Sequence, residues 1–169
     1  KQALRAAHPY EEVAYDVVAM QKADTQTGMG AVGSLPAAEP LPAFLDRIAK
    51  ALRIRAISYV ADEGRPIQRV AVCGGSGSDL VGDAQRAGVD AYVTADVANH
   101  TYFPPLNPDG SVGMGLFNVG HYETEQCTED LLQAWLAERF PEIAFTTTQH
   151  KTSPVRFHVD PDMPDGVKE

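Results

Sequence analysis

Hydrophobic and polar positions along the chain alternate between short apolar runs and stretches with helical periodicity. From residue 41 to residue 52, apolar residues recur at the three-four spacing that buries one face of a helix. Leu80, Ala84 and Ala87 indicate a second helix, and residues 124–140 predict a third. The third helix carries four large apolar residues on one face: Leu131, Leu132, Trp135 and Leu136.

Short apolar runs between these helices predict strands at residues 56–60, 67–73, 91–94 and 116–119. Further strands are expected at residues 13–20, 145–148 and 155–159. Residues 21–42 predict a loop, and the Pro- and Asp-rich tail from residue 160 predicts irregular structure. Strands that alternate with helices predict an α/β fold, in which a mixed sheet is flanked by helices and functional loops lie at the strand ends.

The first residues indicate a piece of a longer chain. Lys1 is not a methionine, and residues 2–7 are strong helix formers that stop at Pro9. A natural domain seldom begins inside a helix whose packing partners are absent. We therefore expect further sequence before Lys1.

Two glycine-rich stretches are candidates for phosphate binding. Residues 28–33 (GMGAVG) match the dinucleotide pattern G-x-G-x-x-G, but no helix starts well before Pro42, so we expect a turn or a close backbone approach there. Residues 74–79 (GGSGSD) lie between a predicted strand and a predicted helix and lack the Lys-Ser/Thr of a P-loop. They form either a tight turn or a loop that lines a ligand site.

Composition narrows the classes of partner. The formal net charge is −9, the pI is about 4.9, and the 14 Lys and Arg residues are scattered, so we expect neither nucleic acid nor membrane as a partner. A local basic groove stays compatible with this composition. No apolar stretch approaches the ~20 residues that span a bilayer, and no signal peptide is visible. Cys73 and Cys127 are expected to be reduced core thiols of a cytoplasmic protein.

Three pairs place a histidine and a carboxylate four residues apart: His8/Glu12, Asp96/His100 and His121/Glu125. On a helix this spacing puts both side chains on one face, where they can converge on one cation. Pro9 interrupts the first pair, which we expect in a loop or at a pocket rim. The second pair follows a predicted strand, where α/β proteins place their sites; alternatively, Asp96 caps a helix and His100 is solvated.

His121 and Glu125 have the strongest context of the three pairs. They follow the predicted strand at residues 116–119 and open the last helix. A neutral imidazole with a carboxylate suits Zn²⁺, Fe²⁺ or Mn²⁺, although Glu125 alternatively only complements the helix dipole. A catalytic zinc site needs about three protein ligands and a structural site about four, so further ligands must come from elsewhere.

Several unusual stretches occur in the order found in one known family and cover most of residues 1–157. They are HPYEEVAYDV (8–17), GMGAVGSL (28–35), VAVCGGSGSDL (70–80), GVDAYVTADVANH (88–100), GHYETE (120–125) and TSPV (152–155). On these stretches the chain resembles the NIF-three-like family of dinuclear-metal, toroidal-hexamer proteins, which are also labelled GTP cyclohydrolase 1 type 2 homologues. In that family, two similar α/β halves enclose a pair of metal ions, usually zinc or iron.

The resemblance implies a domain organisation and a site. Residues 1–36 would be the C-terminal part of a PII/CutA-like insert, residues 37–159 the second half of the metal-binding domain, and residues 160–169 an irregular tail. His121 and Glu125 would be metal ligands, while Asp96 and His100 would be catalytic groups or would line the site wall. The other family ligands belong to the first half, so this chain would hold half of the site and in isolation no metal. Ala95 replaces a glycine usual in the family, which either crowds the crevice or reflects a backbone without positive φ.

Two functions are compatible with this resemblance. One is a metal-dependent hydrolase that acts on an unknown small molecule through water activated by two metal ions. The other is a non-catalytic metal-handling, regulatory or partner-binding protein. The resemblance also implies a homo-oligomer, a hexamer in the family.

Overall fold

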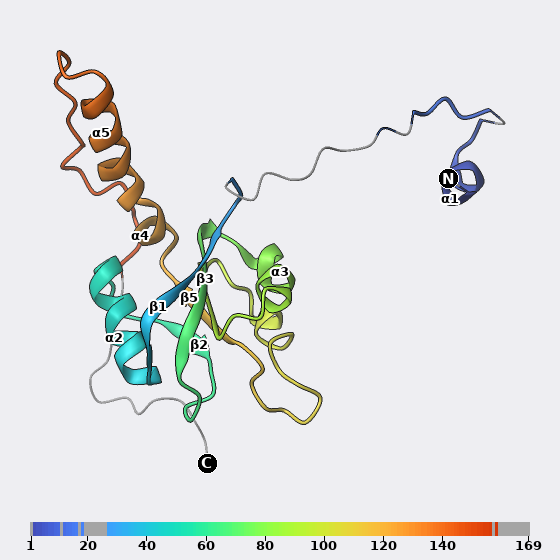
Figure 1. Ribbon diagram of the computed structural model, residues 1–169, viewed down its shortest axis with the longest axis horizontal. Helices are drawn as coiled ribbons and strands as arrows, with labels where there is room; N and C mark the ends of the chain where they lie inside the picture. Colours follow the sequence, from blue (N-terminus) through green and yellow to red (C-terminus); the bar gives the residue numbers. More distant parts are fainter. Residues whose placement is uncertain (1, 11, 17, 19–26, 157, 159–169) are drawn as a thin grey trace.

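A five-stranded mixed sheet forms the centre of the molecule in the computed structural model (Figure 1). The structure describes residues 2–10, 12–16, 18, 27–156 and 158. The strand order is β1-β3-β4-β5-β2. The strands are β1 (Ala31–Glu39), β2 (Ser58–Val60), β3 (Ile67–Ser76), β4 (Ala91–Ala95) and β5 (Gly115–Val119). The α-helices are α1 (Gln2–Ala7), α2 (Leu41–Leu52), α3 (Val81–Arg86), α4 (His121–Glu125) and α5 (Cys127–Arg139), with 3₁₀ turns η1 (Ser78–Leu80) and η2 (Asn99–Tyr102).

The three central strands run parallel and end level with one another. β3 pairs with β4, and β4 with β5, in parallel, whereas the outer strands β1 and β2 are antiparallel to their neighbours. In this register Ser76 pairs with Ala95, and Ala95 pairs with Val119. The carboxyl ends of three parallel strands therefore open onto one edge, where α/β proteins bind ligands. The predicted α/β class with a mixed sheet is confirmed.

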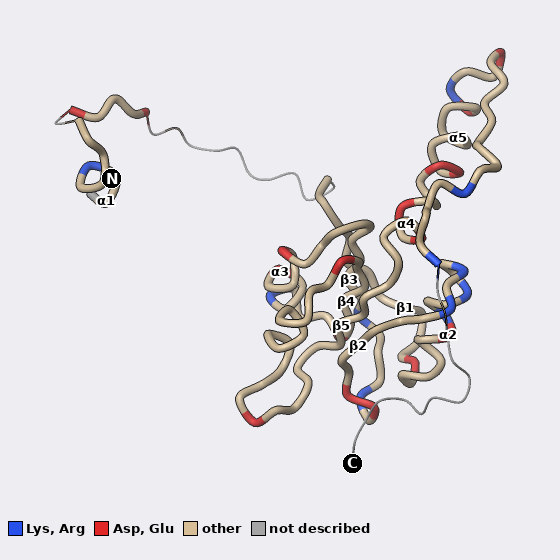
Figure 2. The backbone as a smooth tube through the Cα atoms, turned by 180° about the vertical axis from the view of Figure 1, so that it is seen from behind, with Lys and Arg blue, Asp and Glu red and all other residues tan. Residues whose placement is uncertain are grey.

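Helices cover both faces of the sheet, with α2 on one side and α3 on the other (Figures 1 and 2). β4 is buried along its whole length because its side chains point alternately into two apolar clusters. On the α2 side the cluster holds Leu41, Phe44, Ile48, Ile67, Ala91, Val93, Phe117 and Val119. On the α3 side it holds Ala71, Cys73, Val81, Ala84, Val89, Tyr92, Val97, Met114 and Leu116.

Helix α2 forms where the apolar periodicity predicts it. Pro42 is tolerated in the first turn, where the backbone N–H has no helical partner. Phe44 packs edge-on against Phe117 of β5, with ring centroids 5.2 Å apart. The helix ends at Arg53, whose φ of 56° is left-handed, a conformation that usually falls to glycine at this position.

Strand β1 corrects the expectation of a loop over residues 21–42. Residues 31–34 pair with β3, although glycine and proline are poor strand formers. The pairing is possible because β1 is an edge strand and Pro36 lies where its register shifts, so the missing N–H costs no ladder bond. The expectation that no helix opens at the GMGAVG stretch is confirmed, because these residues lead into β1.

The strands expected near the two ends of the chain are wrong within the described residues. Residues 13–16 and 18 are not in a strand, and neither are residues 145–148, 155, 156 and 158. β-Branched and aromatic residues favour a strand only where a neighbouring strand completes the hydrogen-bond ladder. The remaining residues of these segments, and the tail from residue 160, lie outside the described part. The boundary expected between residues 36 and 37 falls inside β1, and the domain division stays a prediction.

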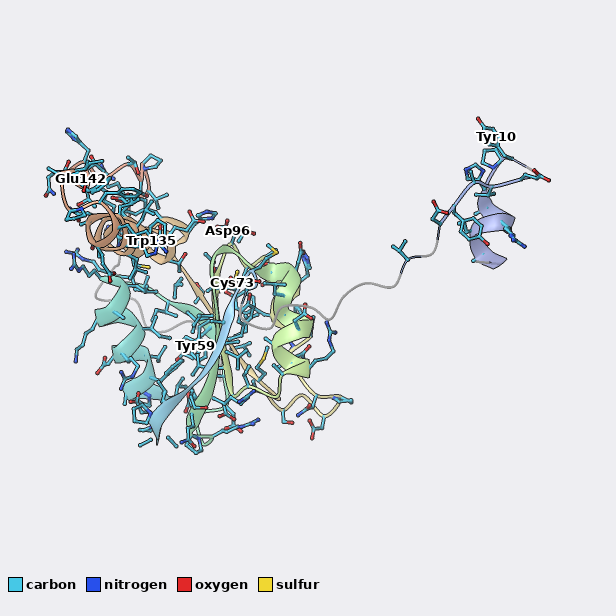
Figure 3. All side chains as sticks on the ribbon, turned by 45° about the horizontal axis from the view of Figure 1, so that its top comes forward. Tyr10, Tyr59, Cys73, Asp96, Trp135 and Glu142 are labelled. Carbon is cyan, nitrogen blue, oxygen red and sulfur yellow. The ribbon has the colours of Figure 1, made fainter. Side chains whose placement is uncertain are left out.

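The last helix begins earlier than expected and consists of two segments, α4 and α5, that meet at Gln126. Its apolar side chains are not buried: Leu131, Leu132 and Trp135 are each more than half exposed. Figure 3 shows Trp135 on this helix. Cys127 is also exposed, which corrects its expected place in the core, whereas Cys73 is buried as predicted. Among the described residues, no helix is long and apolar enough to cross a membrane.

Asp90 holds together the first residues of the central strands. Its carboxylate accepts hydrogen bonds from the backbone N–H groups of Gln68 (3.1 Å) and Arg69 (2.9 Å) and pairs with Arg65 at 2.9 Å. Its backbone carbonyl accepts the N–H of Gly115 at 2.8 Å. Partial burial acts to raise the pKa of Asp90, but the bonds from Arg69, Gln68 and Arg65 outweigh burial and lower that pKa below its usual value.

Replacing Asp90 with asparagine should lower the free energy of unfolding by about 1–3 kcal/mol at neutral pH, because charge-assisted hydrogen bonds are lost. Folding lowers this pKa, so the stabilisation is complete above the unfolded value of about 3.9 and disappears as pH falls through the folded value. Urea unfolding of Asp90→Asn and wild type should therefore converge in acid. Asp83→Asn is the control, because the Asp83–Arg86 pair is exposed. Equal stability of Asp90→Asn and wild type at neutral pH would contradict the assignment.

Candidate metal centre

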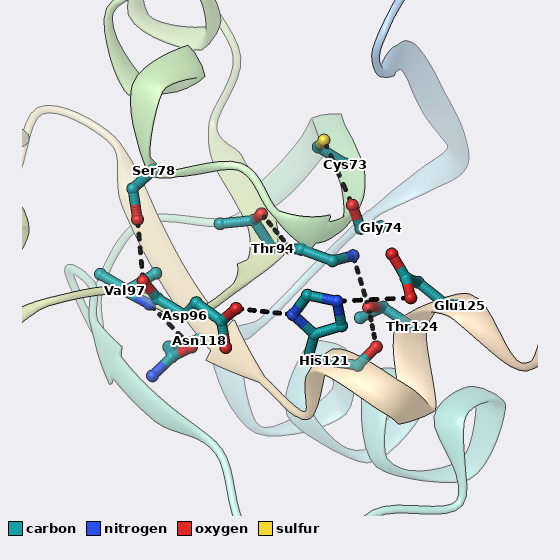
Figure 4. A network of polar contacts seen from close by, with 11 residues as sticks. Cys73, Gly74, Ser78, Thr94, Asp96, Val97, Asn118, His121, Thr124 and Glu125 are labelled. Atoms are coloured by element: carbon teal, nitrogen blue, oxygen red, sulfur yellow. Dashed lines mark hydrogen bonds and ion pairs between the residues drawn. The ribbon is translucent and has the colours of Figure 1, made fainter. Parts of the chain in front are cut away.

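The carboxyl ends of β3, β4 and β5 bring three polar segments together (Figure 4). Asp96 directly follows β4, and His121 follows β5 after Gly120. Gly74 and Gly75 lie near the end of β3, at an irregularity of its pairing with β4. Helix α4 starts at His121 and packs on β3 and β4, so Glu125 lies one turn further along the same helix.

The imidazole of His121 lies between two carboxylates (Figure 4). Its Nδ1 is 2.6 Å from Oδ2 of Asp96, and its Nε2 is 3.3 Å from Oε2 of Glu125. All three side chains are about half exposed. The hydrogen bond with Asp96 is the main cause that raises the pKa of His121 above its usual value, and Glu125 adds a smaller electrostatic contribution. The cluster therefore attracts positive charge.

The backbone around Asp96 is fixed from two sides. Asp96 has a left-handed φ of 53°, and its carbonyl accepts a hydrogen bond from the Ser78 hydroxyl at 3.0 Å. The amide oxygen of Asn118 accepts the N–H of Val97 at 3.3 Å. The preceding Ala95 belongs to β4, is fully buried and has no positive φ. The backbone here therefore does not require the glycine that is usual at this position.

The backbone at Gly75 lies so close to the carboxylate of Glu125 that no side chain fits at position 75. Its φ is 63°, and a Cβ built there would overlap Oε1 of Glu125 and lie 3.1 Å from Nε2 of His121. Its N–H donates to the Thr124 hydroxyl at 2.8 Å, and its carbonyl accepts the Thr94 hydroxyl at 3.2 Å. Contact with the backbone of β3 thus positions helix α4 and Glu125.

Sequence reasoning missed the residues that orient this cluster. Ser78, Thr94, Asn118 and Thr124 each make one of the bonds described above, yet no role was predicted for any of them, although all but Asn118 lie in the stretches that carry the family resemblance. Ser78, Thr94 and Asn118 also share one local signal, a polar side chain at or just after the end of an apolar strand. Residues 74–79 form a strand end and a tight turn, with the peptide N–H of Gly75 already bonded to Thr124.

Among the described residues, no hydrogen bond or ion pair joins the other expected site residues to this cluster. His100 is exposed in η2, and among the described residues it makes no hydrogen bond or ion pair. In the N-terminal pair, Nδ1 of His8 accepts the N–H of Tyr10 at 3.2 Å, so His8 stabilises a turn. The structure therefore brings together Asp96, His121 and Glu125.

The donor geometry fits part of a metal shell. Zinc binds imidazole nitrogen and carboxylate oxygen at about 2.0–2.2 Å, which places two donors on one ion roughly 3 Å apart. The 3.3 Å separation of Nε2 of His121 and Oε2 of Glu125 matches that requirement. Asp96 on Nδ1 is the carboxylate that usually accompanies a metal-binding histidine. Across the described residues, no group of three or more His, Cys, Asp or Glu side chains completes the shell.

Comparison with known proteins establishes the family. The chain matches Duf34/NIF3 (NGG1p interacting factor 3) over residues 3–154. The chain belongs to the Duf34/NIF3 family. The resemblance expected from the sequence motifs is thereby confirmed.

Curated relatives and solved structures agree with this assignment. The GTP cyclohydrolase 1 type 2 homolog of Mycobacterium tuberculosis is 39% identical over 125 residues, which cover 73% of this chain and 32% of that protein. The homolog of Listeria innocua is 29% identical over 163 residues, covering 92% and 41%. The chain therefore spans about a third to two fifths of the length of these relatives.

Two crystal structures share the fold. Staphylococcus aureus protein SA1388 superposes with a TM-score of 0.72 at 24% identity, covering 93% of this chain and 44% of that chain. The Bacillus cereus protein related to NIF3 gives 0.65 at 28% identity, covering 93% and 43%. The arrangement of strands and helices is thus one that the Duf34/NIF3 family adopts.

Gly75→Ala should weaken Zn²⁺ binding by the full-length protein about tenfold or more, because the added methyl group displaces Glu125. Gly88→Ala is a matched control: Gly88 has a φ of 64°, but a Cβ there meets nothing within 4 Å. Both substitutions should lower the melting temperature through backbone strain. Only Gly75→Ala should change metal affinity, measured by titration against a chelating dye. Equal affinities for the two variants would argue against Glu125 as a ligand.

Proposed function

We propose that this protein binds divalent metal, with His121 and Glu125 as ligands that supply half of a two-metal site. The observation that carries this proposal is the position of the His121 imidazole between Asp96 and Glu125. Asp96 accepts the Nδ1 proton and leaves the Nε2 lone pair facing the same space as the Glu125 carboxylate. A nitrogen donor and an oxygen donor of this kind bind zinc and iron readily.

The remaining ligands belong, in this proposal, to a part of the full-length protein outside this chain. Two donors are fewer than the three or four that hold zinc in proteins. The family members that this chain matches are two to three times longer, which leaves room for a second set of ligands. The half-exposed state of His121 and Glu125 fits a site that another part of the protein covers.

We propose a hydrolase as the activity of the complete site. Bound divalent ions supply a water-derived nucleophile at neutral pH and stabilise negative charge that develops in the reaction. Asp96 orients His121, and His100 is the candidate that gives or takes a proton. The relatives named GTP cyclohydrolase 1 type 2 homolog support this class of reaction, although the name belongs to those proteins.

An apolar groove beside the cluster supports a small-molecule ligand. The groove has a volume of about 540 Å³ and runs between β1, β3 and α2, up to Gly74 and Thr124. Volumes of roughly 300–1,000 Å³ are typical of ligand sites. A substrate whose apolar part fills this groove would place its reactive end near Glu125.

We also propose that the protein forms a homo-oligomer, as the family resemblance implies. The exposed apolar residues of α5 form a surface that another subunit could cover.

Metal content tests the proposed ligands. The full-length protein, stripped with a chelator and refilled with Zn²⁺ or Fe²⁺, should hold about two ions per chain by elemental analysis. His121→Ala and Glu125→Gln should each lower that number, and Asp96→Asn should weaken affinity about 10- to 100-fold. His150→Ala is the control, because His150 is exposed and lies in a different pocket. Fewer than one ion per wild-type chain would refute the two-metal proposal.

Turnover distinguishes catalysis from metal handling. The metal-loaded protein should hydrolyse at least one member of a panel of phosphoesters and cyclic amides, and His121→Ala should abolish that turnover. His100→Ala should lower kcat by about 10²- to 10⁴-fold while metal content stays unchanged, because proton transfer is lost and no ligand is removed. Tight metal binding without turnover across the panel would favour a non-catalytic, regulatory role.

A further inference from the structure

Four cationic residues line one pocket, and the Lys and Arg positions coloured blue between α4 and α2 in Figure 2 mark this part of the backbone. The pocket has a volume of about 350 Å³. Its charged lining residues are Arg53, Arg55, Lys151 and Arg156, with Glu123 as one carboxylate among them. The chain has 14 Lys and Arg residues against 23 Asp and Glu residues, so this concentration of positive charge is not a consequence of composition.

The cluster is assembled from parts of the chain that are distant in sequence. Arg53 ends α2, and Arg55 follows it on the way to β2. Lys151 and Arg156 come from the segment after α5, in which one nitrogen of the Arg156 guanidinium donates to the backbone carbonyls of Ser153 at 3.3 Å and Val155 at 3.1 Å. The TSPV stretch (152–155), which contributes no residue to the candidate metal centre, lies in this segment.

Carboxylates within the chain do not neutralise this charge. Lys151 pairs with the buried Glu123 at 3.4 Å. Across the described residues, Arg53, Arg55 and Arg156 form no ion pair. A cation at a helix C-terminus is favourable on its own, which accounts for Arg53 but not for the other two arginines. The positive charges of arginines that line one pocket repel one another, and an anion bound in the pocket would offset that repulsion.

We propose that this pocket binds a phosphate group of a small polar ligand. Guanidinium groups present paired N–H donors that match phosphate oxygens, and Arg53, Arg55 and Arg156 surround a space of suitable size. A second pocket of about 580 Å³ adjoins it and shares Arg53, Glu123 and Lys151. Its polar lining includes Thr147, Thr148 and Gln149 and the carboxylates of Glu129 and Asp130, which can accept hydrogen bonds from the hydroxyl groups of an uncharged remainder of a phosphorylated metabolite.

The phosphate site and the metal half-site share helix α4. Glu123 follows His121 by two residues and precedes Glu125 by two, so its side chain leaves the short helix on the opposite side. A phosphate that draws Lys151 away from Glu123 would therefore act on the element that carries both proposed metal ligands. The phosphate site itself requires no metal, so it stands or falls independently of the metal proposal.

Isothermal titration of metal-free full-length protein with inorganic pyrophosphate tests the site. We expect saturable binding of one pyrophosphate per chain. Arg53→Gln and Arg156→Gln should each weaken binding about tenfold, because each removes a charge-assisted contact. Arg86→Gln is the matched control, since Arg86 pairs with Asp83 on the exposed face of α3, and its affinity should stay within about twofold of wild type.

Three results with pyrophosphate would overturn the proposal. They are an absence of saturable binding, equal losses in Arg53→Gln and Arg86→Gln, and wild-type affinity in both Arg53→Gln and Arg156→Gln. Tighter binding of a single-stranded oligonucleotide that depends on the same arginines would also overturn it, because the surface would then serve nucleic acid. Circular dichroism spectra of all variants should match wild type, and a variant that fails this check is replaced by Arg55→Gln.

Discussion

The level ends of three parallel strands are the constraint on which the rest of the molecule depends. Parallel pairing fixes Ser76, Ala95 and Val119 side by side, so the loops that follow them must leave the sheet at the same edge. Asp96 and His121 are the first polar side chains after two of these ends, and contact between them follows from the register. A one-residue shift of either strand would turn the wrong face toward the site and bury a polar group.

Helix α4 presents polar side chains on two opposite sides, with Glu125 on one side and Glu123 on the other. Gly75 lets the helix approach β3 so closely that the side chains of Glu125 and His121 lie against the β3 backbone, while Thr124 binds that backbone. On the other side, Glu123 and Lys151 tie the helix to the cationic segment after α5. Two ligand chemistries, a divalent cation and a phosphate group, would thus meet the same five-residue helix. This arrangement gives a physical route by which one ligand could alter binding of the other.

The errors of sequence-based prediction have a common physical cause. β1 was expected to be a loop because glycine and proline are poor strand formers, yet pairing with β3 overrides that preference at a sheet edge. Residues 145–148 have strand-forming composition but, in the described structure, no neighbouring strand. The apolar residues predicted on one face of the last helix are largely exposed, because periodicity indicates that a face is apolar but not what covers it.

The sequence by itself determined the α/β class, the central strands, helix α2, the family, and the candidate pair His121 and Glu125, because these depend on local periodicity and on short motifs. Only the tertiary structure decided that Asp96 orients His121, since 25 residues separate them and strand register joins them. It also showed that scattered arginines meet: Arg53 and Arg156 lie about a hundred residues apart in the sequence and line one pocket. Contacts between residues distant in sequence depend on how elements pack, and no local pattern records them.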